Sequence, residues 1–300
     1  MDPLFLYIPT IDGTRKCLHK DKNLEIVVCV FRSIADILYV FHIIIKFRTA
    51  RGPTSYNRID ELDQNVAKRY LLTYGFIIDV LAALPLPQFA VLVLLPNLDG
   101  QPVITKESIS KENVLKFIVF YQYFPRVIQT SLLYRKVTHI FHNLIDEFAW
   151  VRAVCNLLFY VLASHVIGAL WYFFALESEL RCWHDACKRH NCTSKYFHCE
   201  EGHVGDYGFL NTSCPLIERS ESRNSTNFDF GIYLEALKTR VLETNDFRKK
   251  ILYCSLWGLQ NLSSLGQGLK PSTFTGETIF VYFIAVMGLF LFALLIGNIQ

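Results

Sequence analysis

The chain has 300 residues, of which 52% are hydrophobic and only 19% are charged. Soluble domains carry about 25% charged residues, so this composition and the mean hydropathy of +0.26 argue against a purely soluble protein. The formal net charge of +3 is too small to indicate a nucleic-acid-binding protein, because such proteins concentrate excess positive charge on one face.

Five apolar segments are long enough to cross a membrane, since a helix needs about 20 apolar residues to span the hydrocarbon core. They comprise residues 24–47, 70–95, 114–137, 150–176 and 278–299. A further apolar stretch at residues 4–8 is too short to span, and we interpret it as the outer end of a truncated first span. Pro85 and Pro87 predict a break in the second half of segment 70–95. The pattern predicts an all-α, multi-pass integral membrane protein.

Basic residues between the spans predict their orientation, because short cytosolic loops are enriched in lysine and arginine. Basic residues cluster in segment 46–69, and Arg135 and Lys136 end the span 114–137. These sites are expected to be cytosolic, which places residues 178–247 outside the cell. Glycosylation sequons in that outer segment agree with this topology. They begin at Asn191, Asn211 and Asn224.

Cysteines accumulate in the same outer segment, and Cys17, which is expected on the same side of the membrane, makes their number even. Zinc binding is the alternative, but the sequons and the even number favour disulfides. The residues expected to pair in three disulfides are Cys17, Cys182, Cys187, Cys192, Cys199 and Cys214. The remaining cysteines lie in apolar segments and are expected to stay reduced; they are Cys29, Cys155 and Cys254.

Several charged residues lie well inside the apolar spans, where charges are costly and normally face a partner or water. They are Arg32, Asp36, Asp79 and Arg126. They could form either a voltage-sensing relay or static ion pairs within a helical bundle. A voltage sensor carries a series of arginines, whereas Arg126 is the only charged residue between Lys116 and Arg135. The pattern therefore favours static pairing, with the two aspartates placed to neutralise Arg126 or Arg32.

A short helix and a glycine-containing segment precede the last span. Residues 250–263 are expected to form a helix too short to cross the membrane, and the irregular backbone after it is typical of a re-entrant pore loop. A short extracellular amphipathic helix is the alternative. The next five residues align with the Thr-Val-Gly-Tyr-Gly string of potassium filters; they are Ser264, Leu265, Gly266, Gln267 and Gly268. Gln267 replaces the tyrosine that packs behind such filters, so we expect little preference between potassium and sodium.

Several motifs resemble the plant cyclic nucleotide-gated ion channel family over nearly the whole chain. They are DPLFLYIP at residues 2–9, PLPQ at 85–88, FDFGI at 228–232, WGLQNLSSLGQGL at 257–269 and GNIQ at 297–300. Gly268 departs from the family, many of whose members have Asn or Ser there. The resemblance implies a voltage-gated-like channel fold and a tetramer around one central pore. It also assigns Phe292 and Ile296 to a hydrophobic gate, and their spacing of four residues places them on one helical face.

The resemblance predicts three regions: a four-helix sensor-like bundle, a connecting segment and a pore module. They cover residues 1–137, 138–149 and 150–300. Within the pore module we expect an extracellular loop, a pore helix with its filter, and the last span, at residues 178–247, 248–270 and 277–300.

The expected function is that of a pore-forming subunit in a homo- or hetero-tetrameric, weakly selective channel for potassium and sodium, with calcium permeation left open. We expect it in the lipid bilayer of the plasma membrane. The alternative is a non-conducting, truncated subunit that co-assembles with full-length channels and modulates them. Neither catalytic residues nor a metal site, a cofactor or a nucleic-acid partner is expected. The resemblance implies that cyclic nucleotide and calmodulin act through regions missing from this chain.

Overall fold

The computed structural model describes residues 2–49, 74–84, 149–190, 208–217 and 228–297, together with residues 125, 126, 128, 129, 192 and 199. The chain divides into two compact units: residues 1–2 with 26–143, and residues 3–25 with 144–300. The structure therefore differs from the expected bundle of residues 1–137 at its start, because residues 3–25 belong to the same unit as the C-terminal half. The two units are described separately below.

The first unit contains most of α1 (Lys22–Thr49) and all of α3 (Tyr74–Ala83). The helix α1 begins directly after Asp21, whose carboxylate accepts hydrogen bonds from the backbone N–H groups two and three residues further on. This is the usual N-cap arrangement. The surface of α1 is apolar, and Ile37 and Leu38 are 66% and 63% exposed. A helix of a soluble protein would bury most of these side chains, so α1 suits a lipid environment.

Three helices among the described residues are long and apolar enough to cross a membrane. They are Lys22–Ile45, Ala153–Arg189 and Thr275–Gly297, and they coincide with three of the predicted spans. Most of the predicted spans 70–95 and 114–137 lies outside the described residues, apart from α3 and a few positions around Arg126.

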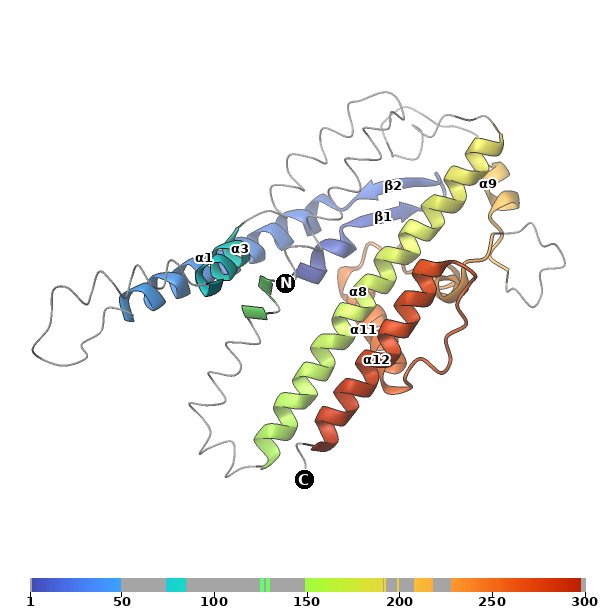
Figure 1. Ribbon diagram of the computed structural model, residues 1–300. Helices are drawn as coiled ribbons and strands as arrows, with labels where there is room; N and C mark the ends of the chain where they lie inside the picture. Colours follow the sequence, from blue (N-terminus) through green and yellow to red (C-terminus); the bar gives the residue numbers. More distant parts are fainter. Residues whose placement is uncertain are drawn as a thin grey trace, which may run out of the picture. The chain divides into compact units, whose positions relative to one another are not determined.

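The second unit begins with a short 3-10 helix, η1 (Asp2–Tyr7), followed by strands β1 (Pro9–Asp12) and β2 (Cys17–Lys20). The strands form an antiparallel hairpin in which Pro9 is opposite Lys20. The stretch 4–8 is thus not the end of an α-helix in this structure. Figure 1 shows the hairpin beside the upper part of α8, where the Tyr172 hydroxyl donates a hydrogen bond to the Pro9 carbonyl at 2.7 Å.

The helix α8 (Ala149–Arg189) has 41 residues and is therefore about 60 Å long, twice the thickness of a bilayer core. The predicted span 150–176 lies within α8, and the helix continues to Arg189, into the segment 178–247 that is expected to be an extracellular loop. Residues 177–189 contain neither glycine nor proline and continue the helix. They also continue its buried face, because Cys182, Trp183 and Ala186 are almost fully buried.

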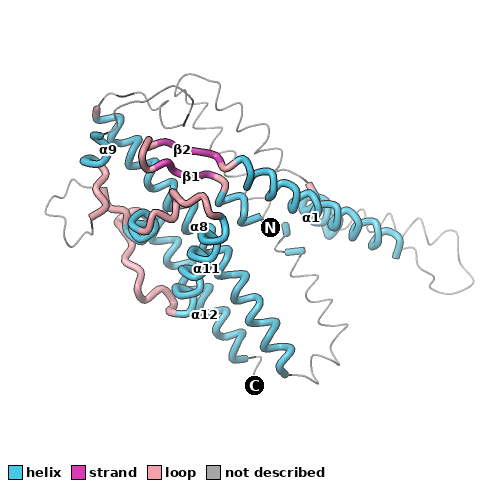
Figure 2. The backbone as a smooth tube through the Cα atoms, turned by 180° about the vertical axis from the view of Figure 1, so that it is seen from behind, coloured by secondary structure: helices cyan, strands magenta, loops and turns pink. Residues whose placement is uncertain are grey.

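Two further long helices pack against α8, as both backbone views show (Figures 1 and 2). They are α11 (Phe247–Ser263) and α12 (Thr275–Gly297). Glycines allow these helices to approach closely. A Cβ added at Gly168 of α8 would overlap the Cys254 carbonyl of α11, and one added at Gly288 of α12 would lie 2.5 Å from the Leu262 carbonyl. The helix α11 is thus held tightly between α8 and α12.

Shorter elements complete the second unit. They are α9 (Gly208–Ser213), η4 (Gly231–Tyr233) and α10 (Leu234–Lys238).

Candidate functional site

The predicted pore segment begins with α11. The helix starts three residues earlier than the sequence predicts because the Asp246 carboxylate caps it, accepting a hydrogen bond from the Arg248 N–H at 3.1 Å. Its buried residues share one face; they are Lys250, Cys254, Trp257, Gly258 and Leu262. With 17 residues, α11 is about 26 Å long, and it lies against two helices of membrane-spanning length. A re-entrant helix would likewise be packed against membrane-spanning helices.

The five predicted filter residues follow the end of α11, and their backbone forms two consecutive turns. The Gln267 N–H donates to the Ser264 carbonyl at 3.1 Å, and the Leu269 N–H donates to the Gly266 carbonyl at 3.0 Å. Leu265 and Gly266 have φ angles of 54° and 74°, in the left-handed region that glycine tolerates and other residues enter at a cost of about 1–2 kcal/mol. Potassium filters instead present successive carbonyls to the ion. The alignment with such a filter therefore holds for the residue types and not for the backbone of this chain.

The outer part of this segment is open in a single chain. Gln267, Gly268 and Lys270 are all exposed, and a Cβ added at Gly268 would meet no other atom within 4 Å. A residue with a side chain would therefore fit at position 268. The glycine at this position is thus not required by packing within one chain.

The last helix, α12, has one buried face and one exposed face. The buried residues are Glu277, Phe280, Ile284, Gly288 and Leu291. The predicted gate residues Phe292 and Ile296 are 50% and 44% exposed. Two large apolar side chains one turn apart are thus available on a surface that α8 and α11 leave uncovered.

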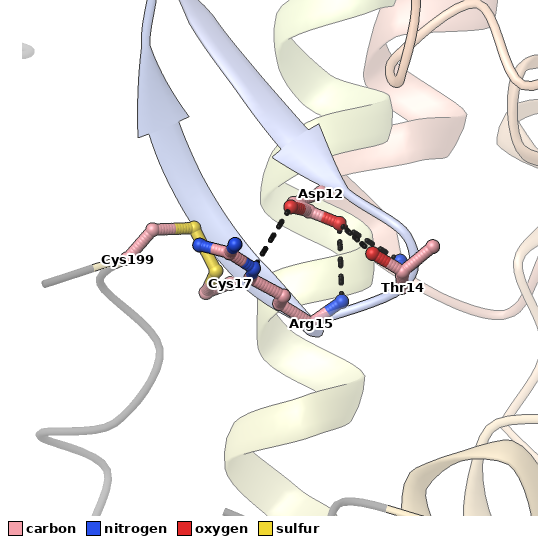
Figure 3. The surroundings of a disulfide bond; sticks show 5 residues. All are labelled: Asp12, Thr14, Arg15, Cys17 and Cys199. Atoms are coloured by element: carbon pink, nitrogen blue, oxygen red, sulfur yellow. Dashed lines mark hydrogen bonds and ion pairs between the residues drawn. A yellow bond between two sulfur atoms is a disulfide. The ribbon is translucent and has the colours of Figure 1, made fainter. Parts of the chain in front are cut away.

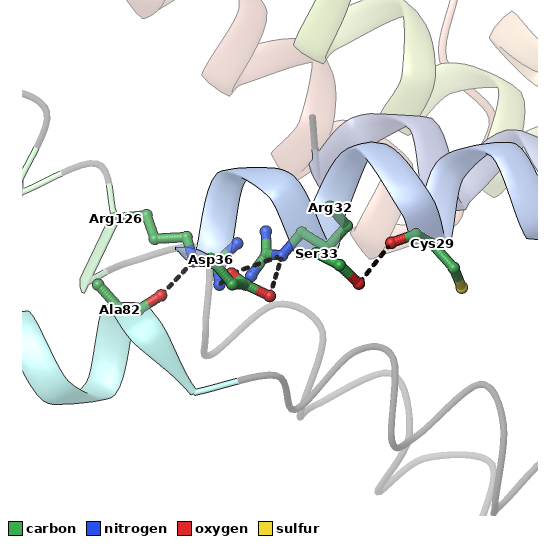
Figure 4. Close-up of polar contacts among 6 residues, drawn as sticks. All are labelled: Cys29, Arg32, Ser33, Asp36, Ala82 and Arg126. Carbon is green, nitrogen blue, oxygen red and sulfur yellow. Dashed lines mark hydrogen bonds and ion pairs between the residues drawn. The ribbon is translucent and has the colours of Figure 1, made fainter. Parts of the chain in front are cut away.

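The predicted intramembrane charges are buried in the first unit, and Figure 4 shows three of them together. The Asp36 Oδ1 atom lies 3.0 Å from Arg126 Nη2 and 3.1 Å from Arg32 Nε. The Arg126 Nε atom also donates a hydrogen bond to the Ala82 carbonyl near the end of α3, at 2.9 Å. Asp36 therefore forms an ion pair with each arginine and balances one of their two positive charges.

Asp79 has a neighbour that the sequence reasoning missed. Its Oδ1 atom accepts a hydrogen bond from Gln129 Nε2 at 3.0 Å, and Gln129 is only 4% exposed. The available signal was spacing, because Gln129 follows Arg126 by three residues and such residues share a helical face. Tyr39 adds a cation–π contact, with its ring centre 5.6 Å from Arg126 Cζ.

The six cysteines of the predicted outer side pair in three disulfides. The bonds are Cys17–Cys199, Cys182–Cys214 and Cys187–Cys192, and Cys29, Cys155 and Cys254 remain thiols. The Cα–Cα distances of 5.2, 6.1 and 4.9 Å lie within the usual range for disulfides. The connectivity could not be deduced from sequence, since six cysteines allow 15 pairings.

The disulfide of Cys17 lies beside the hairpin turn (Figure 3). At this turn Asp12 accepts hydrogen bonds from the Thr14 hydroxyl and from the backbone N–H groups of Thr14 and Arg15. The hydrogen bond from the Thr14 hydroxyl lowers the pKa of Asp12 below its usual value. Lys250 of α11 also contacts this N-terminal segment, because its Nζ donates a hydrogen bond to the Tyr7 carbonyl at 3.4 Å. The segment before α1 is therefore attached to the candidate site.

The sequence of this chain is similar to those of known proteins. Residues 5–300 match a family model described as "Ion transport protein". The chain is 48% identical to cyclic nucleotide-gated ion channel 1, 46% identical to probable cyclic nucleotide-gated ion channel 10 and 42% identical to cyclic nucleotide-gated ion channel 11, all of Arabidopsis thaliana. Each match covers the whole chain but only 41%, 42% and 48% of the respective relative. The chain thus spans less than half the length of these curated relatives.

Proposed function

The chain belongs to the ion transport protein family, whose members are channels and not enzymes, and from that premise we propose that it is the membrane part of a subunit in a tetrameric cation channel. The observation that carries this proposal is the one pore segment among the described residues, in which α11, the turns at residues 264–268 and α12 follow one another. One such segment per chain can enclose a pore only when several copies surround a common axis. Four copies are the number that the family resemblance implies.

In this assembly residues 264–268 of each copy would form the narrowest polar part of the pore. Two carbonyls of the segment already accept backbone hydrogen bonds in the turns, which leaves fewer oxygens to replace the hydration shell of an ion. Gln267 adds a neutral amide. We therefore propose a weakly selective filter that passes sodium and potassium.

The lower part of α12 would carry the gate. Phe292 and Ile296 would meet their counterparts from the other copies, and such an apolar constriction blocks conduction by excluding water. Cyclic nucleotide, which the names of the relatives mention, would act on this gate through parts of the protein that the matched segment does not contain.

Ion flux tests the proposal directly. The complete protein that the gene encodes would be purified, reconstituted into lipid vesicles and exposed to cyclic AMP or cyclic GMP. We expect both sodium and potassium to cross the membrane, as followed with ion-sensitive dyes. No flux under either nucleotide would contradict the proposal, whereas an effect seen only after co-assembly with a related subunit would favour a modulatory subunit instead.

The proposed topology predicts glycans on the segment 178–247. Asn211 is exposed in α9, whereas Asn191 and Asn224 lie outside the described residues. Asn261 is also in a sequon, but it lies in α11, with its side chain donating to the Trp257 carbonyl at 2.8 Å, and should stay bare. A glycosidase mobility-shift assay on single Asn→Gln variants gives the answer. Loss of a glycan in Asn261→Gln, or no glycan at any of the other three sites, would overturn this topology.

A further inference from the structure

Three backbone segments meet at the carboxylate of Glu277, in the first turn of α12. Glu277 is only 2% exposed. Its Oε1 atom accepts a hydrogen bond from the Ile232 N–H at 2.7 Å, and its Oε2 atom accepts one from the Ser272 hydroxyl. Ser272 lies four residues beyond Gly268, on the stretch that leads from the filter to α12. Glu277 therefore ties the stretch after the filter segment to η4.

The backbone at Gly231 is shaped to admit this carboxylate. Gly231 has a φ of 49°, and a Cβ added there would overlap Glu277 Oε1 and lie 2.6 Å from the Ser272 nitrogen. Both the conformation and the space thus require glycine at this position. The close approach brings the Glu277 carboxylate against the backbone of η4. Hydrogen bonds from backbone N–H groups to a carboxylate are charge-assisted and therefore strong.

The backbone at Ile232 is also bound by α8, and through α8 it is linked to α11. Trp171 Nε1 donates to the Ile232 carbonyl at 3.1 Å, so both polar groups of the Ile232 backbone are bound. The Trp171 ring stacks on the Trp257 ring of α11, with centroids 4.2 Å apart and planes 9° apart. A continuous series of contacts therefore runs from α12 through Ile232 and Trp171 to the helix that precedes the filter.

We propose that Glu277 is a positioning residue that holds the filter in its conducting conformation. This inference rests on the proposed channel function and adds a residue that lies outside the filter itself. The filter segment is attached at its start to α11 and at its end to Ser272. When the Glu277 contacts are lost, the outer end is released, and the turns at residues 264–268 can rearrange while α8, α11 and α12 stay packed through their glycines.

The experiment must separate this role from a contribution to folding alone. A folding defect lowers the number of channels at the surface, but it does not change how each channel behaves. A loosened filter instead makes the current decay during steady activation. Ions bound in the filter stabilise the conformation that binds them, so raising external potassium should slow this decay.

Recordings would use the complete protein in excised patches at saturating cyclic AMP or cyclic GMP, with surface biotinylation of every variant. In Glu277→Ala, where both hydrogen bonds are lost, we expect decay about tenfold faster than in the parent, slowed again by high external potassium. Glu277→Gln keeps an acceptor for the Ile232 N–H and an amide that can donate to Ser272, so it should restore nearly parental decay. Thr278→Ala, at an exposed neighbouring position, is the matched control.

A second variant keeps the inference testable if Glu277→Ala does not reach the surface. Ser272→Ala removes only one of the two contacts and should accelerate decay about threefold. Parental decay in Glu277→Ala, or in Ser272→Ala if Glu277→Ala does not reach the surface, would overturn the inference and leave the channel proposal intact. Decay in Glu277→Gln as fast as in Glu277→Ala would also overturn it. A parent without any current would overturn the channel proposal, and the inference with it.

Discussion

Replacing Gln267 by glutamate is expected to strengthen block of the monovalent current by external calcium or magnesium by about tenfold or more. Gln267 is exposed at the outer end of the filter segment, and four copies would place four carboxylates in one ring. A pair of unit charges 4 Å apart contributes about 1 kcal/mol even in bulk water. For a divalent ion the interaction energy with each carboxylate is twice as large. A change of about 1.4 kcal/mol in binding free energy already corresponds to a tenfold change in affinity.

Reversal potentials in mixed sodium and potassium solutions, with divalent titrations of parent and variant, measure this effect. Gln267→Asn, which keeps a neutral amide, is the control and should leave the block near the parental value. The difference should shrink at high ionic strength if the ring faces water. Strong potassium selectivity in the parent, or a divalent response that Gln267→Glu leaves untouched, would mean that Gln267 does not line the filter.

Asp36→Asn is expected to destabilise the protein by about 3–5 kcal/mol, the usual cost of breaking a buried ion pair from one side. Asp36 lies within 3.1 Å of both Arg32 and Arg126, and the two arginines are 1% and 5% exposed. The neutral amide leaves both guanidinium groups without their shared counter-charge. The cost is large because little water reaches this part of the first unit.

The measurement is the thermal stability of the detergent-solubilised protein, with the folded fraction after heating determined by size-exclusion chromatography. Asp185→Asn is the control, because it is the same chemical change at an exposed position, and it should stay within about 0.5 kcal/mol of the parent. Adding Arg126→Gln to Asp36→Asn should recover part of the loss, since one buried charge is removed. An Asp36→Asn variant as stable as the control would refute a structural role for this cluster.

The features that followed from sequence are those set by composition over a long stretch. Uniform apolar character identifies α1 and α12, because a membrane demands it along a whole helix. The pairing of Asp36 with Arg126 follows from the same rule, since charges in an apolar span need partners. In both cases the requirement comes from the apolar interior of the membrane and can be read from the residue type within a span.

The features that were missed depend on contacts between distant residues. Glu277 reads as an ordinary acidic residue in the first turn of a helix, and its contact with Ile232 lies 45 positions away. Lys250 reaches Tyr7 across 243 positions. The hairpin after η1 did have a local signal, because Asp12 and Gly13 form a typical turn pair, but the apolar stretch before it was interpreted as a helix end. Periodicity carries no information on which loop meets which helix.

The bond between Cys17 and Cys199 also bears on the order of events during synthesis. Its two cysteines are 182 residues apart, so translation at 5–20 residues per second leaves the first without its partner for about 10 to 40 s. In the proposed topology three other cysteines enter the oxidising lumen during that interval, at positions 182, 187 and 192. Any early bond between them and Cys17 must be undone by thiol–disulfide exchange. Where such bonds form, maturation requires this exchange to take place after Cys199 has entered the lumen.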